Sequence, residues 1–191
     1  MRSSPLADRQ SPLVRWSAVA RFLHWLVALL IAVQFVLGWL AVSWHLSPTK
    51  LNLFVWHKST GMLVLALVLV RLAWRATHRV PALPLRMRRW ERIAAGASHG
   101  LLYVAMLALP LSGWVINSAS GVPFRIYWRI PLPSIAAPDK HLADLASAVH
   151  LALGIALLVL LLVHVAAALR HHYIQRDDVL ARMLPWRSPL R

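Results

Sequence analysis

The 191-residue sequence contains no cysteine and few acidic residues. Without cysteine, the chain can form no disulfide, no thiolate-bound iron–sulfur cluster and no covalent c-type haem site, which requires a Cys-x-x-Cys-His segment. The six carboxylates all lie at or beyond the ends of the long apolar segments, so these segments offer no carboxylate to a metal ion or a proton. The six are Asp8, Glu91, Asp139, Asp144, Asp177 and Asp178.

Charged residues of either sign are also scarce, at 14% of the chain, whereas apolar residues make up 59%. Soluble domains carry about a quarter charged residues. A bilayer core is crossed by about 20 apolar residues of helix, and four segments reach that length. They span about residues 18–42, 53–74, 93–116 and 142–169. The sequence therefore predicts one all-α domain over residues 1–191, an integral membrane four-helix bundle.

The first apolar segment follows a basic start, as a signal peptide would. It is longer than the apolar part of a signal peptide, and no small-residue cleavage site follows it, so we expect a retained helix. The net charge of +15 suits nucleic-acid binding at first sight. The arginines, however, lie in the gaps between apolar segments, which is typical of membrane topology. We therefore expect no nucleic-acid partner.

Sixteen of the 21 Lys and Arg residues lie before or at the start of the first segment, at the end of the second or between it and the third, or after the fourth. Because basic connections are retained in the cytoplasm, we expect both termini there, in a multi-pass membrane protein that contacts lipid. Residues 175–187 are expected to form a short amphipathic helix on the inner membrane surface.

Five of the ten histidines lie within the apolar segments, where an ionisable side chain is costly and is a functional candidate. His150 and His164 share one predicted helix. Fourteen residues place them about 21 Å apart along the axis and within about 40° of the same face. One thus lies near the outer surface and the other near the inner. By depth, His57 on the second segment accompanies His150, and His24 on the first accompanies His164.

Two such pairs favour haem over other metal sites. Zinc takes four ligands, commonly with cysteine or carboxylate among them, and the apolar segments contain neither. A porphyrin supplies four nitrogens and leaves two axial positions for histidine. The prediction is two haem b groups, ligated by His57 with His150 and by His24 with His164. The plainer interpretation is that these histidines are hydrogen-bonded contacts between helices.

Gly61 and Gly154 each follow a histidine of the outer pair by four residues and so lie on its helix face. We expect them to let a flat macrocycle approach the backbone, although close helix packing explains them equally well. His99, near the start of the third segment, lies on the inner side. Either it replaces His24 as the inner ligand, or it faces a quinone pocket, where a histidine can donate a hydrogen bond and pass a proton.

Several segments resemble the bacterial cytochrome b561 family. They are RFLHWLV in the first apolar segment, HKSTG in the second, HGLLYVAMLALPLSG in the third, and HVAAALRHHYIQRDDVLARMLP at the end of the fourth. The resemblance extends from about Arg15 to Pro185. It implies four transmembrane helices and two b haems with the same histidine pairs as ligands. The layout is also similar to that of the cytochrome b subunits of membrane-bound formate dehydrogenases and hydrogenases.

The resemblance further implies a quinone-linked oxidoreductase, because some members of the family are superoxide oxidases that pass the electron to ubiquinone. By analogy, a quinone would bind on the inner side near His99 or His171. Basic residues on the outer side are candidates for steering a small anionic donor such as superoxide, although contact with lipid headgroups is the plainer explanation for each. These are Lys58, Arg125, Arg129 and Lys140.

Two other functions stay open. The chain can be the membrane anchor of a soluble dehydrogenase or hydrogenase, with that redox protein as its electron donor. It can also be a histidine-lined metal or proton transporter, which the lack of carboxylates within the apolar segments disfavours.

Overall fold

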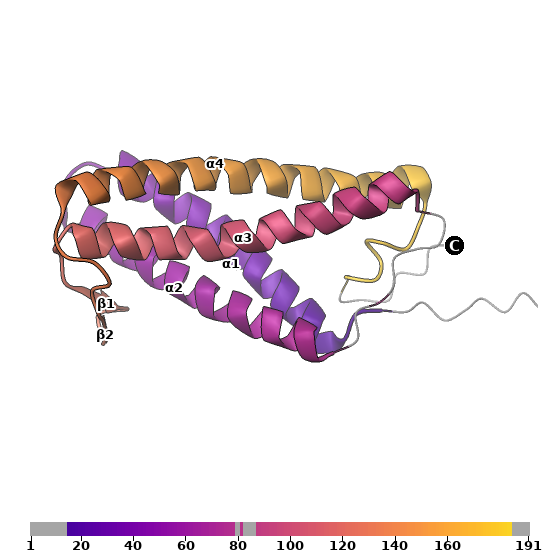
Figure 1. The fold of residues 1–191 in the computed structure, drawn as a ribbon, viewed down its shortest axis with the longest axis horizontal. Coiled ribbons are helices and arrows are strands. Elements are labelled where there is room, and N and C mark those ends of the chain that lie inside the picture. The colour runs from indigo at the N-terminus through magenta and orange to yellow at the C-terminus, as the bar shows by residue number, and fades with distance from the viewer. Residues whose placement is uncertain (1–14, 79–80, 82–86, 185–191) are drawn as a thin grey trace, which may run out of the picture.

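Four long helices form the protein in this computed structural model, which describes residues 15–78, 81 and 87–184 (Figure 1). The helices are α1 (Ala18–Ser43), α2 (Pro48–Thr77), α3 (Arg89–Ala119) and α4 (Lys140–Arg170). A π-helical turn, η1 (His171–Gln175), continues α4, and a hairpin of β1 (Phe124–Ile126) and β2 (Ile130–Leu132) connects α3 to α4. All four helices are long and apolar enough to cross a membrane. The predicted all-α membrane bundle is thus confirmed.

The helices extend beyond the predicted apolar segments because polar residues cap them. The Ser47 hydroxyl accepts a hydrogen bond from the Lys50 N–H at 3.3 Å, and Pro48 occupies the first helical position. Glu91 accepts from the Arg88 N–H at 3.0 Å at the start of α3. Such caps satisfy backbone donors that an apolar run cannot, and they add one or two turns at the membrane surface.

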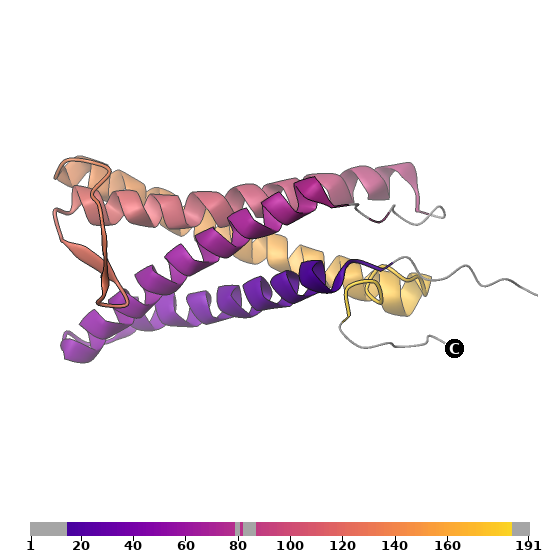
Figure 2. The same cartoon turned by 90° about the horizontal axis from the view of Figure 1, so that it is seen from below.

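Helix α1 packs chiefly on α2, α3 packs chiefly on α4, and α2 and α3 join the two halves. The β-hairpin lies at one end of the bundle, and the described C-terminal segment lies at the other (Figures 1 and 2). The start of α1, the end of α2, the start of α3 and the end of α4 therefore share one end. This arrangement follows from four antiparallel crossings.

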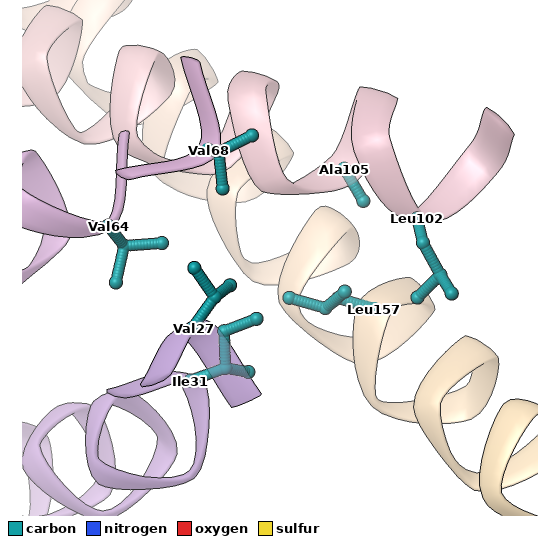
Figure 3. Packing of buried hydrophobic residues seen from close by; sticks show 7 residues of the cluster. All are labelled: Val27, Ile31, Val64, Val68, Leu102, Ala105 and Leu157. Atoms are coloured by element: carbon teal, nitrogen blue, oxygen red, sulfur yellow. The ribbon is translucent and has the colours of Figure 1, made fainter. Parts of the chain in front are cut away.

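The core is a cluster of apolar residues halfway along the bundle, to which every helix contributes (Figure 3). Its fully buried members are Val27, Ile31, Val64, Val68, Leu102, Ala105 and Leu157. Along α4 the cluster lies between His150 and His164. Along α1 it lies between His24 and Gln34, and along α2 between His57 and Arg71. Most remaining large apolar side chains are exposed on the helix surfaces, as expected where lipid is the neighbour.

Residues 176–184 differ from the expected short helix over 175–187. Arg176 has a left-handed backbone (φ 52°), which ends η1, and hydrogen-bonded turns follow. Side chains near the start of α1 take up the backbone carbonyls of these turns: Arg21 Nη1 donates to Leu184 at 2.9 Å, and Trp25 Nε1 donates to Met183 at 2.9 Å. These tertiary hydrogen bonds replace helical ones. Residues 185–187 lie outside the described residues.

The core makes a testable prediction about stability. Leu157 is 4% exposed, whereas its neighbour Leu158 is 44% exposed on the outside of α4. Leu157→Ala removes packing in the central cluster and should lower the free energy of unfolding by about 2 kcal/mol. Thermal unfolding in detergent measures the effect, and Leu158→Ala is the matched control. Equal losses in the two variants would contradict this placement of the core.

Candidate functional site

Two histidine rings from different helices lie together toward the hairpin end of the bundle. The ring centroids of His57 on α2 and His150 on α4 are 6.2 Å apart, at an interplanar angle of 74°. His57 Nδ1 is buried and has no hydrogen-bond partner within the described part of the chain. The structure therefore brings together the two histidines that depth alone assigned to the outer side.

Ser112 on α3 decides which ring nitrogen of His150 carries hydrogen. The Ser112 hydroxyl donates its one hydrogen to the Leu109 carbonyl at 2.8 Å. It can therefore only accept from His150 Nδ1, which lies 2.9 Å away. This pattern assigns the hydrogen to Nδ1 and leaves the lone pair on Nε2. A neutral imidazole whose Nδ1–H is hydrogen-bonded is the usual form of a metal ligand.

At the opposite end of the bundle, the ring of His164 on α4 faces two other histidines. The centroid of His24 on α1 lies 6.3 Å away, and that of His99 on α3 lies 5.5 Å away. Among the described residues, no three histidine or acidic side chains are arranged to hold a metal ion by themselves. A metal at this end would thus need ligands beyond the side chains that the described residues bring together.

The ring separations bear on what the pairs can hold. With metal–nitrogen bonds of about 2.0 Å and ring centres about 1.1 Å beyond each nitrogen, two imidazoles opposed across one metal ion have centroids about 6.2 Å apart. The His57–His150 and His24–His164 separations of 6.2 and 6.3 Å match this value. The His99–His164 separation of 5.5 Å is shorter than the value for opposed ligands. By this measure each predicted pair would be able to hold the metal of a haem between its two rings, and the ligand assignment stays a prediction.

The two glycines predicted to flank the outer site have different surroundings. A Cβ on Gly61 would lie 2.9 Å from Gln34 Nε2, which donates to the His57 carbonyl at 2.9 Å. Gly61 therefore makes room for a contact between α1 and α2, which supports the packing explanation. A Cβ on Gly154 would have no described atom within 4 Å. Open space beside Gly154 fits a bound macrocycle.

Two other glycines lie against the outer histidine rings, and the sequence analysis did not single them out. A Cβ on Gly38 would lie 3.0 Å from His57 Cε1, and a Cβ on Gly113 would lie 3.5 Å from His150 Cε1. Both glycines belong to neighbouring helices, so spacing along one helix could not reveal them. The polar Ser112 beside Gly113 was the available signal, because a hydroxyl in an apolar segment needs a partner.

The β-hairpin is fastened to α2 directly after His57. Tyr127 and Trp128 at its turn have left-handed backbones, with φ of 46° and 61°, a conformation that costs about 1–3 kcal/mol for each such residue. The Tyr127 N–H donates to the Ser59 hydroxyl at 2.8 Å, and the Tyr127 OH lies 3.1 Å from Thr60 Oγ1. These contacts offset the strain and fix the loop over the outer histidine pair.

The four residues predicted to steer an anionic donor differ in whether a neighbouring side chain already binds their charge. Lys58 Nζ donates to Asn117 Oδ1 at 2.8 Å, and Lys140 forms an ion pair with Asp144 at 2.6 Å. Arg125 on β1 and Arg129 in the turn of the hairpin are exposed and have no ion-pair partner in the ranges that the structure describes. The two hairpin arginines therefore retain the positive charge available on the outer side.

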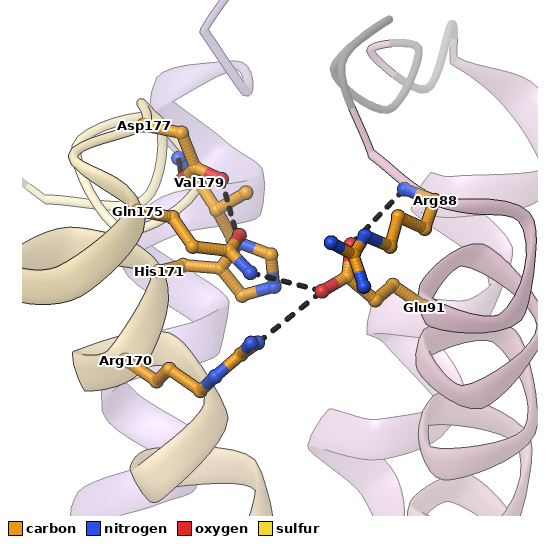
Figure 4. Close-up of polar contacts among 7 residues, drawn as sticks. All are labelled: Arg88, Glu91, Arg170, His171, Gln175, Asp177 and Val179. Atoms are coloured by element: carbon orange, nitrogen blue, oxygen red, sulfur yellow. Dashed lines mark hydrogen bonds and ion pairs between the residues drawn. The ribbon is translucent and has the colours of Figure 1, made fainter.

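His171, the second quinone candidate, is buried in a polar cluster at the C-terminal end of α4 (Figure 4). Its Nδ1 lies 2.5 Å from Asp177 Oδ2. Next to it, Glu91 accepts from Arg170 Nη1 at 3.2 Å and from Gln175 Nε2 at 2.9 Å. The cluster ties the start of α3 to η1, and the Asp177 contact occupies one nitrogen of the His171 ring.

Comparisons with known proteins agree with this architecture. The family model of the prokaryotic cytochrome b561 proteins matches residues 15–186. Cytochrome b561 homolog 2 of Escherichia coli K12 is 32% identical over 176 residues, which cover 89% of this chain and 91% of that protein. Cytochrome b561 homolog 1 of the same organism is 29% identical, over 91% of this chain and 99% of that protein.

A third relative, from Yersinia pestis, is named a probable superoxide oxidase, CybB. It is 26% identical over 90% of this chain and 96% of its own length. The family match covers nearly the whole chain, including all four helices and both histidine pairs. The chain therefore belongs to the prokaryotic cytochrome b561 family of bacterial membrane proteins, which bind b haem and transfer electrons.

Proposed function

We propose that the chain holds two b haems, one between His57 and His150 and one between His24 and His164, and transfers electrons across the membrane to ubiquinone. The observation that carries this proposal is the pair of ring separations, 6.2 and 6.3 Å, which match two imidazoles on opposite faces of one metal ion. The ring separations also favour His24 over His99 as the inner ligand, because the His99–His164 separation of 5.5 Å is too short for two opposed ligands. A bound haem supplies an iron that takes up and releases one electron.

The protein's own residues orient and separate the two sites. Ser112 holds His150 with Nε2 free, and the 14 residues from His150 to His164 carry α4 about 21 Å along its axis. The central apolar cluster lies between the two pairs and excludes water from that stretch. Bundle interiors are common locations for such cofactors.

The proposed orientation puts the hairpin outside and both termini in the cytoplasm, within the bacterial inner membrane. The end of α2 and the start of α3, which flank the most basic connection of the sequence, lie at the same end as the start of α1 and the end of α4, which agrees with retention of positive charge in the cytoplasm. The chain acts as one domain in this proposal. A transporter function is disfavoured, because the described spans offer no cluster of metal ligands.

The proposed donor is superoxide, in line with the name of the Yersinia pestis relative. Two superoxide anions each lose one electron and become dioxygen, and one ubiquinone takes up these two electrons and two protons to become ubiquinol. Arg125 and Arg129 attract the anion to the outer side. His99 is the stronger candidate for hydrogen bonding to the quinone, since Asp177 already occupies Nδ1 of His171.

The ligand assignment predicts haem content. The wild-type protein should carry about two haems per chain, measured by the pyridine haemochrome method, and should show the reduced-minus-oxidised spectrum of a low-spin b haem. His150→Leu should remove the outer haem and His164→Leu the inner haem, because each loses one of two protein ligands. His141→Leu, at the exposed start of α4, is the control and should keep both haems. A colourless, folded wild-type protein would refute the proposal.

The inner ligand is tested separately by two matched variants. His24→Leu should halve the haem content, whereas His99→Leu should leave it unchanged and slow ubiquinone reduction. The reverse pattern would identify His99 as the ligand.

The Ser112 hydroxyl predicts a weaker outer site when it is removed. Ser112→Ala deprives His150 Nδ1 of its acceptor, so haem affinity should fall about 10- to 100-fold. The outer haem should also become easier to reduce, because the imidazole donates less electron density to iron. Ser112→Thr keeps a hydroxyl and should restore both properties. Ser147→Ala, on the exposed face of α4, is the control; an equal loss there would point to general destabilisation.

The steering role predicts a salt-dependent rate. Replacing Arg125 and Arg129 together by Gln should slow haem reduction by superoxide in stopped-flow measurements and flatten its dependence on ionic strength. Lys140→Gln is the control, because the charge of Lys140 is already paired with Asp144. Unchanged salt dependence in the double variant would exclude steering by the hairpin.

A further inference from the structure

Arg71 carries a positive charge within a membrane-spanning helix and has no carboxylate partner in the part of the chain that the structure describes. It lies about two turns before the end of α2 and is half-buried. An arginine at such a depth is costly unless an anion accompanies it. The described carboxylates that form ion pairs do so elsewhere: Glu91 with Arg170, Asp144 with Lys140, and Asp177 with His171.

One side of the Arg71 guanidinium is fixed in place. Its Nε donates to the Tyr103 hydroxyl of α3 at 3.0 Å. Its two terminal nitrogens make no hydrogen bond to any described residue. These nitrogens form the planar fork that suits the two oxygens of a carboxylate. The two terminal nitrogens of Arg71 are therefore held in a fixed orientation, and no described residue accepts a hydrogen bond from them.

Arg71 interacts electrostatically with the three histidines at its end of the bundle. Its charge lies within electrostatic range of His24 on α1, His164 on α4 and His99 on α3. A small cavity opens beside it, lined also by Trp74 and Arg75. A second cation, Arg75, therefore lies one turn further along the same helix, at the same cavity. Two cations, Arg71 and Arg75, at one cavity favour the binding of an anionic ligand there.

We propose that Arg71 binds a carboxylate of the haem held by His24 and His164. The inference rests on the proposed haem at that pair, since the macrocycle carries two propionate carboxylates. The residue that anchors the carboxylate also adds a positive charge next to the inner site. A nearby cation stabilises the reduced iron, which carries one positive charge fewer, and so favours electron flow from the outer site to the inner one.

The test uses the full-length haem-loaded protein and the charge-removing variant Arg71→Gln. Potentiometric titration should show about a tenfold lower equilibrium constant for reduction of one haem, equivalent to about 59 mV for a one-electron couple. The other haem should be unaffected. Arg71→Lys should recover most of the shift. Placing Arg71→Gln in the His150→Leu background, which retains only the inner haem, assigns the shift to that site.

Arg75→Gln is the matched control, with the same charge change one turn away on the same helix. Its effect should be less than a third of that of Arg71→Gln, because Arg75 is exposed and its guanidinium lies 5.8 Å from the centre of the Trp16 ring. An equal effect would show a general influence of charge and overturn the assigned contact. If Arg71→Gln does not assemble, reconstitution of the wild-type apoprotein with haem dimethyl ester removes the carboxylates instead. The loss of their negative charge should raise the inner potential, opposite in sign to the effect of Arg71→Gln, and an unchanged potential would overturn the contact.

Other outcomes separate this inference from the proposed function. Normal haem content with an unchanged inner potential in Arg71→Gln would overturn only the carboxylate contact. Unchanged haem content in His164→Leu would overturn the ligand assignment and this inference together. A third outcome is that the inner potential depends on anionic lipid in nanodiscs and loses this dependence in Arg71→Gln. A lipid phosphate would then be the partner of Arg71, and the haem carboxylate would not.

Discussion

The structure depends on a polar pair in an apolar medium: a histidine ring on α4 set against a histidine ring of another helix. Imidazole is costly in a membrane unless it binds something. Helix α4 meets this constraint twice, since 14 residues return to nearly the same face and one helix presents His150 to one end and His164 to the other. The remaining helices are arranged around these two positions, and the apolar cluster fills the space between them.

The two ends satisfy the constraint differently. At the outer end the protein holds the ligand itself: Ser112 fixes the His150 ring, and the β-hairpin is hydrogen-bonded to the residues directly after His57. At the opposite end three histidines converge, and the cation Arg71 has no carboxylate partner among the described residues. The outer site is therefore defined by fixed hydrogen bonds, whereas the inner site is defined by charge.

This asymmetry suits a chain that takes an electron at one surface and delivers it at the other. In the proposed function, the positively charged hairpin attracts an anion, and positive charge near the His24–His164 pair favours the reduced state there. The strained turn at Tyr127 and Trp128 belongs to the same arrangement, because its cost is accepted only where tertiary contacts hold it. Membrane proteins place such irregular backbone at their ends, where water or protein can satisfy it.

The sequence by itself determined the four spans, the family and the depth of each histidine, because hydropathy and helical rise depend only on local order along the chain. It could not determine contacts between helices. Gly38 and Gly113 lie against the histidine rings, while Gly61 accommodates Gln34, and only packing reveals these partners. The turns at 176–184 likewise replaced a predicted helix, since Arg21 and Trp25, more than 150 residues away, bind their carbonyls. Local periodicity sets the elements; the tertiary structure decides which side chains meet, because hydrogen bonds and close approach act between segments distant in sequence.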